Sequence, residues 1–248
     1  MNFVMRIPYS GLGDQLFFSP IPSLIKLSFP SSKVLVLLER GTRNHSIIDM
    51  IWKSNPNVDA ICYESNEQWP LPRIKVVSND NLLARNAKSL GLACEPNLLP
   101  KIYTSIEIDK NYVNKTVVDL NYISFVGAIS RKKLIKLFCD PNIYFVNRPD
   151  WIKTGKNVVP KSLFHYASII KSSKEFHCLT SGGATLAAAL GKPAKCYFGK
   201  GQDKMFHHCD FHEYVDVSDN FMKTAMVYLK YKTYTRLKRK VLEIVGRY

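Results

Sequence analysis

The fold is decided in residues 3–26, which read FVMRIPYSGLGDQLFFSPIPSLIK. A short apolar run predicts a strand over residues 3–8, and the amphipathic segment after the turn predicts a helix. Between them, Gly11 and Gly13 can adopt positive φ or let a ligand approach the bare backbone. Asp14 follows where the helix begins. Because open α/β folds bind ligands at the carboxyl ends of strands and at helix N-termini, we expect a functional site here.

The rest of the chain repeats the alternation of strands and helices. Residues 33–38 form a nearly continuous run of branched apolar residues, which is typical of a parallel strand buried on both faces. Further strands are predicted at 58–63, 117–126, 143–146, 176–179 and 193–198, and helices at 19–29, 45–52, 82–90, 131–138, 162–172 and 184–190. We therefore predict an α/β protein with two Rossmann-like domains facing a cleft, residues 1–115 and residues 116–248, with the polar residues 110–115 as the linker.

Composition bounds the class of protein. The chain has 248 residues, of which 46% are hydrophobic, so it can bury a sizeable core and is not of the disordered class. No apolar run approaches the roughly 20 residues that span a bilayer, and the first residues lack the pattern of a secretory signal. We expect a cytoplasmic protein. The six cysteines are scattered without a C-x-x-C pair, which predicts reduced thiols.

The formal net charge of +15 favours an anionic partner. Nucleic acid, an anionic membrane and phosphate-bearing substrates all fit that description, and general solubility explains the charge equally well. The chain shows no RRM, KH or zinc-finger signature, so we expect no nucleic acid as partner. The basic and apolar residues at 221–248 predict a C-terminal helix packed across both domains; the alternative is peripheral contact with an anionic membrane.

A second glycine turn lies at residues 179–185, again between a predicted strand and a predicted helix. Its hydroxyls and the N–H groups that follow Gly182 are suited to bind a diphosphate at the helix N-terminus. The alternative is a tight turn whose small residues let the helix pack closely on the strand. The candidate diphosphate-binding residues of this turn are Thr180, Ser181, Gly182, Gly183 and Thr185.

Another cluster, His207-His208-Cys209-Asp210 with His212, consists of residue types that bind zinc. Adjacent side chains point apart in regular structure, and the sequence offers no second pair of ligands. We therefore predict no metal site. We expect this loop to line a donor pocket, with His207 in contact with a phosphate or the base.

Taken together, these motifs resemble the ADP-heptose:lipopolysaccharide heptosyltransferases. Residues 9–26 followed by Phe29-Pro30 are similar to the opening of that family, and residues 55–59 (NPNVD) to the segment before its third strand. Residues 162–199 resemble its donor-site block, including the run AAALGKP at 187–193. The matches occur in both halves and in the order of the family. Two positions depart from it, because Thr180 and Thr185 stand where the family has Asp and His, and the chain is shorter than usual members.

The resemblance implies the GT-B fold and a glycosyltransferase that inverts the anomeric centre without a metal or a cofactor. It also implies that Asp14 is the catalytic carboxylate. From chemistry alone, a base for the acceptor hydroxyl and an N-cap of the helix are equally good roles for Asp14. Gly11, Gly13 and Gln15 would form the acceptor-side turn. Lys132 would be a cation near the diphosphate, unless it belongs to a solvated basic helix face.

The predicted function is transfer of a sugar from a nucleoside-diphosphate sugar to a glycan or glycolipid acceptor, within the synthesis of surface glycans. The departures at Thr180 and Thr185 leave the donor open between heptose and another sugar. They also motivate an alternative function, a non-catalytic module of the same fold that holds a nucleotide or a glycan.

Overall fold

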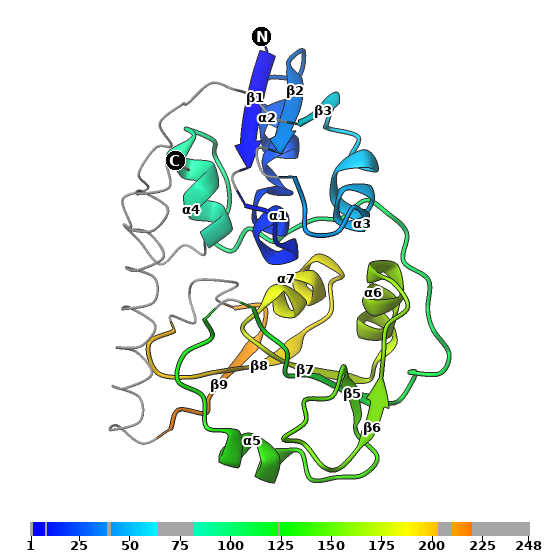
Figure 1. Ribbon diagram of the computed structural model, residues 1–248. Helices are drawn as coiled ribbons and strands as arrows, with labels where there is room; N and C mark the ends of the chain where they lie inside the picture. The colour runs from blue at the N-terminus through cyan, green and yellow to red at the C-terminus, as the bar shows by residue number, and fades with distance from the viewer. Residues whose placement is uncertain are drawn as a thin grey trace, which may run out of the picture.

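The computed structural model describes residues 2–7, 9–38, 41–63, 82–123, 125–202 and 210–219 (Figure 1). The first half is built on a parallel sheet with the strand order β1-β2-β3. Its strands are β1 (Asn2–Ile7), β2 (Lys33–Leu38) and β3 (Ala60–Tyr63). Its helices are α1 (Leu12–Phe18), α2 (Ile21–Ser28), α3 (Ser46–Ile48), which continues into a π-helical turn (Asp49–Lys53), and α4 (Leu82–Ser89).

The second half is built on a six-stranded parallel sheet. Its strands are β4 (Thr116–Asp119), β5 (Tyr144–Val146), β6 (Lys156–Val158), β7 (Glu175–Leu179), β8 (Ala194–Phe198) and β9 (Glu213–Asp216). Its helices are α5 (Arg131–Leu137), α6 (Leu163–Ser172) and α7 (Gly182–Ala189). The order β6-β5-β4-β7-β8-β9 is that of a Rossmann sheet, in which strand addition reverses direction between β4 and β7.

The two faces of the second sheet carry different helices. Successive side chains of a strand point to opposite faces. Val117 and Cys178 join the core formed with α6 and α7, which continues into the first half. Val118 joins a smaller core with Leu134 of α5. Figure 1 shows α6 and α7 between the second sheet and the first half, and α5 on the outer side. Residues that share a face with Val117 are therefore turned toward the first half.

The predicted alternation of strands and helices is confirmed in both halves, and the differences have local causes. Two helices, α1 and α2, replace a single helix from residue 19, because Pro20 and Pro22 remove backbone donors at the junction. The predicted strand 117–126 ends at Asp119. The sequence predicts neither β6 nor β9, because strands of three and four residues carry little periodic signal.

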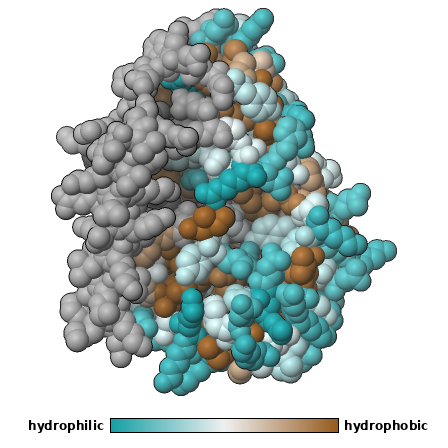
Figure 2. Space-filling view, viewed as in Figure 1, coloured by the Kyte–Doolittle hydropathy of each residue, from teal (hydrophilic) through white to brown (hydrophobic). Residues whose placement is uncertain are grey.

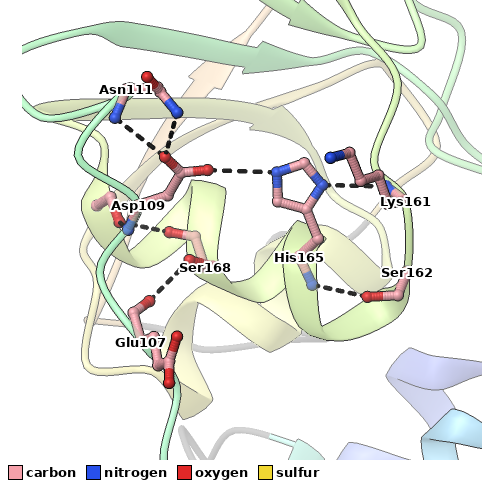
Figure 3. A network of polar contacts seen from close by, with 8 residues as sticks. Glu107, Asp109, Asn111, Lys161, Ser162, His165 and Ser168 are labelled. Atoms are coloured by element: carbon pink, nitrogen blue, oxygen red, sulfur yellow. Dashed lines mark hydrogen bonds and ion pairs between the residues drawn. The ribbon is translucent and has the colours of Figure 1, made fainter.

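Residues 104–107 make hydrogen bonds to both halves. Thr104 donates a hydrogen bond to a carbonyl of the π-helical turn in the first half (3.1 Å). The Glu107 carbonyl accepts one from Ser168 of α6 in the second half (2.7 Å). Figure 3 shows His165 of α6 pointing toward the Asp109 carboxylate, at 3.3 Å. These contacts hold residues 104–109 against both the π-helical turn and α6.

Two expectations about organisation stay predictions. The division between residues 115 and 116 is one of them, and the C-terminal helix predicted within 221–248 lies outside the described residues. In the described part of the chain, each helix is too short or too polar to cross a membrane.

Candidate active site

A cavity of about 620 Å³ opens where the two glycine turns meet. The first half contributes the turn at residues 11–14 and the Arg43 side chain to its lining. The second half contributes the turn at residues 180–185 and the segment that follows β4. The cavity thus lies at the carboxyl ends of β4 and β7, where the strand order reverses. Open α/β sheets bind their ligands at this point.

The two turns touch through their glycines. A Cβ added to Gly13 would lie 3.2 Å from Gly182 Cα, and one added to Gly182 would lie 3.2 Å from the Gly13 nitrogen. Side chains at either position would therefore push the turns apart. The bare backbones let the N-terminal ends of α1 and α7 meet at the cavity. Figure 1 shows α1 and α7 next to each other at the centre of the molecule.

Asp14 is the third residue of α1, and Gly11 is the N-cap of that helix. The Asp14 carboxylate accepts a hydrogen bond from the Gly11 backbone N–H, which is one half of a capping box. A Cβ on Gly11 would lie 2.7 Å from Asp14 Oδ2, so only glycine leaves room for this arrangement. Asp14 also lines the cavity. The carboxylate therefore caps the helix and at the same time is open to a substrate.

Burial raises the pKa of Asp14 above its ordinary value, whereas the Arg43 guanidinium and the Gly11 N–H lower it. A higher pKa makes the carboxylate a stronger base, which suits proton abstraction. Arg43 enters the cavity from the loop after β2, and its backbone N–H donates to the Ser10 carbonyl (3.0 Å). Arg43 cannot be predicted from the sequence, because no local pattern indicates that this loop returns to the glycine turn.

The second turn leads from β7 directly into α7, with Ser181 as the N-cap. The Ser181 side chain makes no capping hydrogen bond, so the N–H groups at the start of α7 have no side-chain cap and are available to an anion. Thr185 contacts the Ser181 carbonyl through Oγ1 at 3.5 Å. Ala184 and Ala187 are fully buried against the sheet. The turn therefore shows the close packing of the alternative interpretation together with an open helix N-terminus.

A buried acid that the sequence analysis does not single out lies beside this turn. Asp119 ends β4, and its carboxylate accepts hydrogen bonds from the Asn121 backbone N–H (2.9 Å), from the Asn121 amide (2.8 Å) and from the Tyr166 hydroxyl. Burial raises the pKa of Asp119, and these three bonds oppose the rise. A Cβ on Gly183 would lie 2.5 Å from the Tyr166 hydroxyl oxygen. Glycine is thus required where α7 packs over the pair. The predicted strand 117–126 hides this acid, because it places Asp119 inside a strand and not at its end.

Three of the predicted site residues are not found at the cavity: two lie elsewhere in the structure and one lies outside the described residues. Gln15 is fully buried, and its amide accepts from the Trp52 indole N–H (2.6 Å) and donates to the Tyr9 carbonyl, so it packs the first half and does not line the cavity. Lys132 is exposed on the outer side of the second sheet, because α5 buries Leu134 and turns its lysines to solvent. His207 lies outside the described residues.

His212, from the predicted histidine-rich loop, has a structural role. Its ring accepts a hydrogen bond from the Ala194 N–H (3.1 Å) and contacts the Ala184 carbonyl within α7 (2.9 Å). Burial lowers the pKa of His212 to about 4, so the ring is neutral near pH 7. Among the described residues, no three His, Cys, Asp or Glu side chains gather as a metal site.

Comparison with known proteins identifies the architecture. No family model and no curated protein matches the sequence. Among solved structures, the family 9 glycosyl transferase from Veillonella parvula DSM 2008 matches with a TM-score of 0.61 and 10% identity, over 93% of this chain and 89% of that one. E. coli heptosyltransferase WaaC with ADP matches with a TM-score of 0.53 and 14% identity, over 87% and 93%. The chain has the GT-B fold.

The GT-B fold confirms the predicted class of two Rossmann-like halves around a cleft. A third neighbour is the iron-containing heptosyltransferase TibC in complex with ADP-D-beta-D-heptose, with a TM-score of 0.58 and 12% identity, over 84% of this chain and 61% of that one. The resemblance to heptosyltransferases, inferred from the motifs, is thus borne out by the three-dimensional structure. At identities of 10–14% the likeness concerns the fold, and the activity has to be argued from the site.

Proposed function

We propose that this protein is a glycosyltransferase that moves a sugar from a nucleoside-diphosphate sugar to a hydroxyl of a glycan or glycolipid. One observation carries the proposal. A partly buried carboxylate, Asp14, and the uncapped N-terminus of α7 meet at one cavity of a GT-B fold. Sugar transfer needs these two elements, a base for the incoming hydroxyl and N–H groups for the departing diphosphate.

In the proposed reaction, Asp14 takes the proton of the acceptor hydroxyl as its oxygen attacks the anomeric carbon. The bond from that carbon to the diphosphate oxygen breaks, and the nucleoside diphosphate leaves with the electron pair. The new glycosidic bond forms on the face opposite the departing group, so the anomeric centre inverts. The proton remains on Asp14 until solvent removes it.

The departing diphosphate would bind at Ser181, Gly182, Gly183 and Thr185, with its charge against the N-terminus of α7. The mechanism requires neither a metal nor a cofactor, since the helix N-terminus and a nearby cation supply the positive potential. Arg43 is the cation that lines the cavity among the described residues. The neighbours with ADP or ADP-heptose in their names support a nucleotide sugar as donor, and this chain's sugar is left open by Thr180 and Thr185.

The acceptor would enter on the side of Asp14, Gly11 and Gly13. The net charge of +15 supports an anionic glycan or glycolipid and peripheral contact with an anionic membrane. Figure 2 shows hydrophilic side chains over much of the second half on the face drawn there. Sedimentation with vesicles that contain anionic lipid, compared with neutral vesicles, tests the membrane contact.

The test of the activity is turnover of a panel of ADP-, UDP- and GDP-sugars with and without glycan acceptors. We expect Asp14→Asn to reduce turnover by about 100-fold or more, because it removes the base while the side chain keeps its size. Asp49→Asn is the matched control, since Asp49 lies in an exposed ion pair with Lys53 away from the cavity. Full activity of a folded Asp14→Asn variant would contradict the proposal.

The second candidate function is a non-catalytic module that holds a nucleotide or a glycan. It is favoured by the hydrogen bond that ties Asp14 to the Gly11 N–H, since capping alone explains that contact. Tight binding of a nucleotide sugar without hydrolysis or transfer, over the whole panel, would establish this function in place of catalysis.

A further inference from the structure

Two polar side chains at the reversal point of the second sheet have no part in the reaction described above. Asp119 ends β4, and Thr180 follows β7 on the neighbouring strand. Asp119 is paired in register with Cys178, two residues before Thr180, so all three side chains lie on one face of the sheet. This is the face turned toward the first half, and both Asp119 and Thr180 line the cavity.

Asp119 has room for one more hydrogen bond. Its Oδ1 accepts both the N–H and the amide of Asn121, which occupies the two lone pairs of that oxygen. Its Oδ2 accepts the Tyr166 hydroxyl and keeps a second lone pair. These contacts and the burial of the side chain, which is 7% exposed, hold the carboxylate in place. The fold therefore fixes the direction of the remaining Oδ2 lone pair.

Thr180 carries a hydroxyl without a partner. The residue is 3% exposed, and within the described residues Oγ1 has no hydrogen bond, although the side chain lines the cavity. A buried hydroxyl without a partner costs stability, and native proteins keep few of them. Because the Thr180 side chain lines the cavity, a ligand bound there can supply the missing partner.

We propose that Asp119 and Thr180 form a floor of the cavity that binds hydroxyl groups of the donor's sugar. The Asp119 carboxylate can accept a hydrogen bond from a sugar hydroxyl. Thr180 both donates and accepts, as the hydroxyls of a sugar do. The diphosphate is bound by the N-terminus of α7. Thr180 is then a ligand of the sugar and not the phosphate ligand that the sequence predicts. This inference rests on the proposed use of a nucleotide sugar.

A purely structural role accounts for only part of these observations. The bonds of Asp119 to Asn121 and Tyr166 would join β4 to α6 in any protein of this shape. They do not explain the unpartnered Thr180 hydroxyl at the cavity. A residue kept for the fold loses stability when its polar atom is removed, whereas a residue kept for a ligand does not.

The experiment compares free nucleotide with nucleotide sugar, using ADP against ADP-glucose and UDP against UDP-glucose in calorimetric titrations. The variants are Thr180→Val and Asp119→Asn. The matched control is Thr104→Val, because Thr104 donates a hydrogen bond to the Met50 carbonyl and lies outside the cavity. Thermal unfolding is measured for each variant.

We expect Thr180→Val to weaken binding of the sugar nucleotide about fivefold and to leave binding of the free nucleotide unchanged. Its unfolding temperature should stay equal or rise, whereas that of Thr104→Val should fall with no change in binding. Asp119→Asn should weaken sugar-nucleotide binding about thirtyfold, since the lost acceptor is charged.

Equal losses of affinity for nucleotide and nucleotide sugar would overturn this proposal and show that Thr180 contacts the phosphates. Unchanged binding of both by folded Thr180→Val would overturn it as well, while leaving the glycosyltransferase proposal intact. If the wild-type protein binds none of the four probes and turns over no nucleotide sugar, the proposed function fails and the floor fails with it.

Discussion

Replacement of Gly11 by alanine should move the Asp14 carboxylate while leaving its chemical nature unchanged. The added Cβ would lie 2.7 Å from Asp14 Oδ2, so the carboxylate must move by about 0.7 Å to reach an ordinary contact of 3.4 Å. Gly11 has φ −80° and ψ 152°, which alanine adopts without strain. The backbone therefore tolerates the change, and the side chain of Asp14 takes up the displacement.

The expected loss follows from that displacement. A misplacement of about 1 Å in a reacting group costs on the order of 100-fold in rate, so Gly11→Ala should lower kcat by about 30-fold to 100-fold. The stability cost of alanine for glycine at an N-cap is below about 1 kcal/mol. The assay is initial-rate turnover of the best donor of the wild-type protein, alongside urea unfolding to confirm the fold.

A double-mutant cycle with Asp14→Asn decides whether the loss acts through the carboxylate. If Gly11 only positions Asp14, Gly11→Ala should have almost no further effect on turnover in the Asp14→Asn background. Additive losses would show that Gly11 acts on the substrate directly. A fully active Gly11→Ala protein would refute the reasoning that the carboxylate needs this exact place.

Three further perturbations test other parts of the site. Arg43→Gln should move the acidic limb of the kcat/KM pH profile to higher pH, because the guanidinium lowers the pKa of Asp14. Arg43→Lys should restore the wild-type limb. An unmoved limb in the glutamine variant would show that Arg43 does not set the pKa of Asp14. Gly183→Ala should destabilise the protein by about 1–3 kcal/mol in urea unfolding, since its Cβ would lie 2.5 Å from the Tyr166 hydroxyl oxygen; wild-type stability would show that α7 shifts freely. The pKa of His212 is lowered from 6.5 to about 4, so the unfolded chain binds the proton more tightly than the folded protein. The free energy of unfolding should therefore fall by about 3 kcal/mol as the pH drops from 6.5 toward 4. His212→Gln should remove that part of the loss, and an identical pH dependence in the variant would count against this role of His212.

Features that depend on neighbouring residues are predictable from the sequence, and features that depend on distant residues are not. The apolar run at residues 33–38 and the glycine turn before Asp14 are local patterns, and both appear in the structure as predicted. Gln15 shows the limit, because its hydrogen bond to Trp52 joins residues 37 positions apart and turns the amide into the core. Lys132 shows another limit, since the face on which α5 packs depends on the sheet and not on the helix.

The sequence by itself determined the alternation of strands and helices, the two glycine turns and the carboxylate at the start of α1, because each is encoded in neighbouring residues. Only the tertiary structure decided that the two turns meet and that Arg43 and Asp119 enter the same cavity. The pairing of β4 with β7 is the physical reason that Asp119 lies beside the turn after β7. It joins strands more than 50 residues apart and brings the ends of both to the reversal point of the sheet. The meeting of the two turns depends on Gly13 and Gly182, whose missing side chains let the helix ends approach to contact distance.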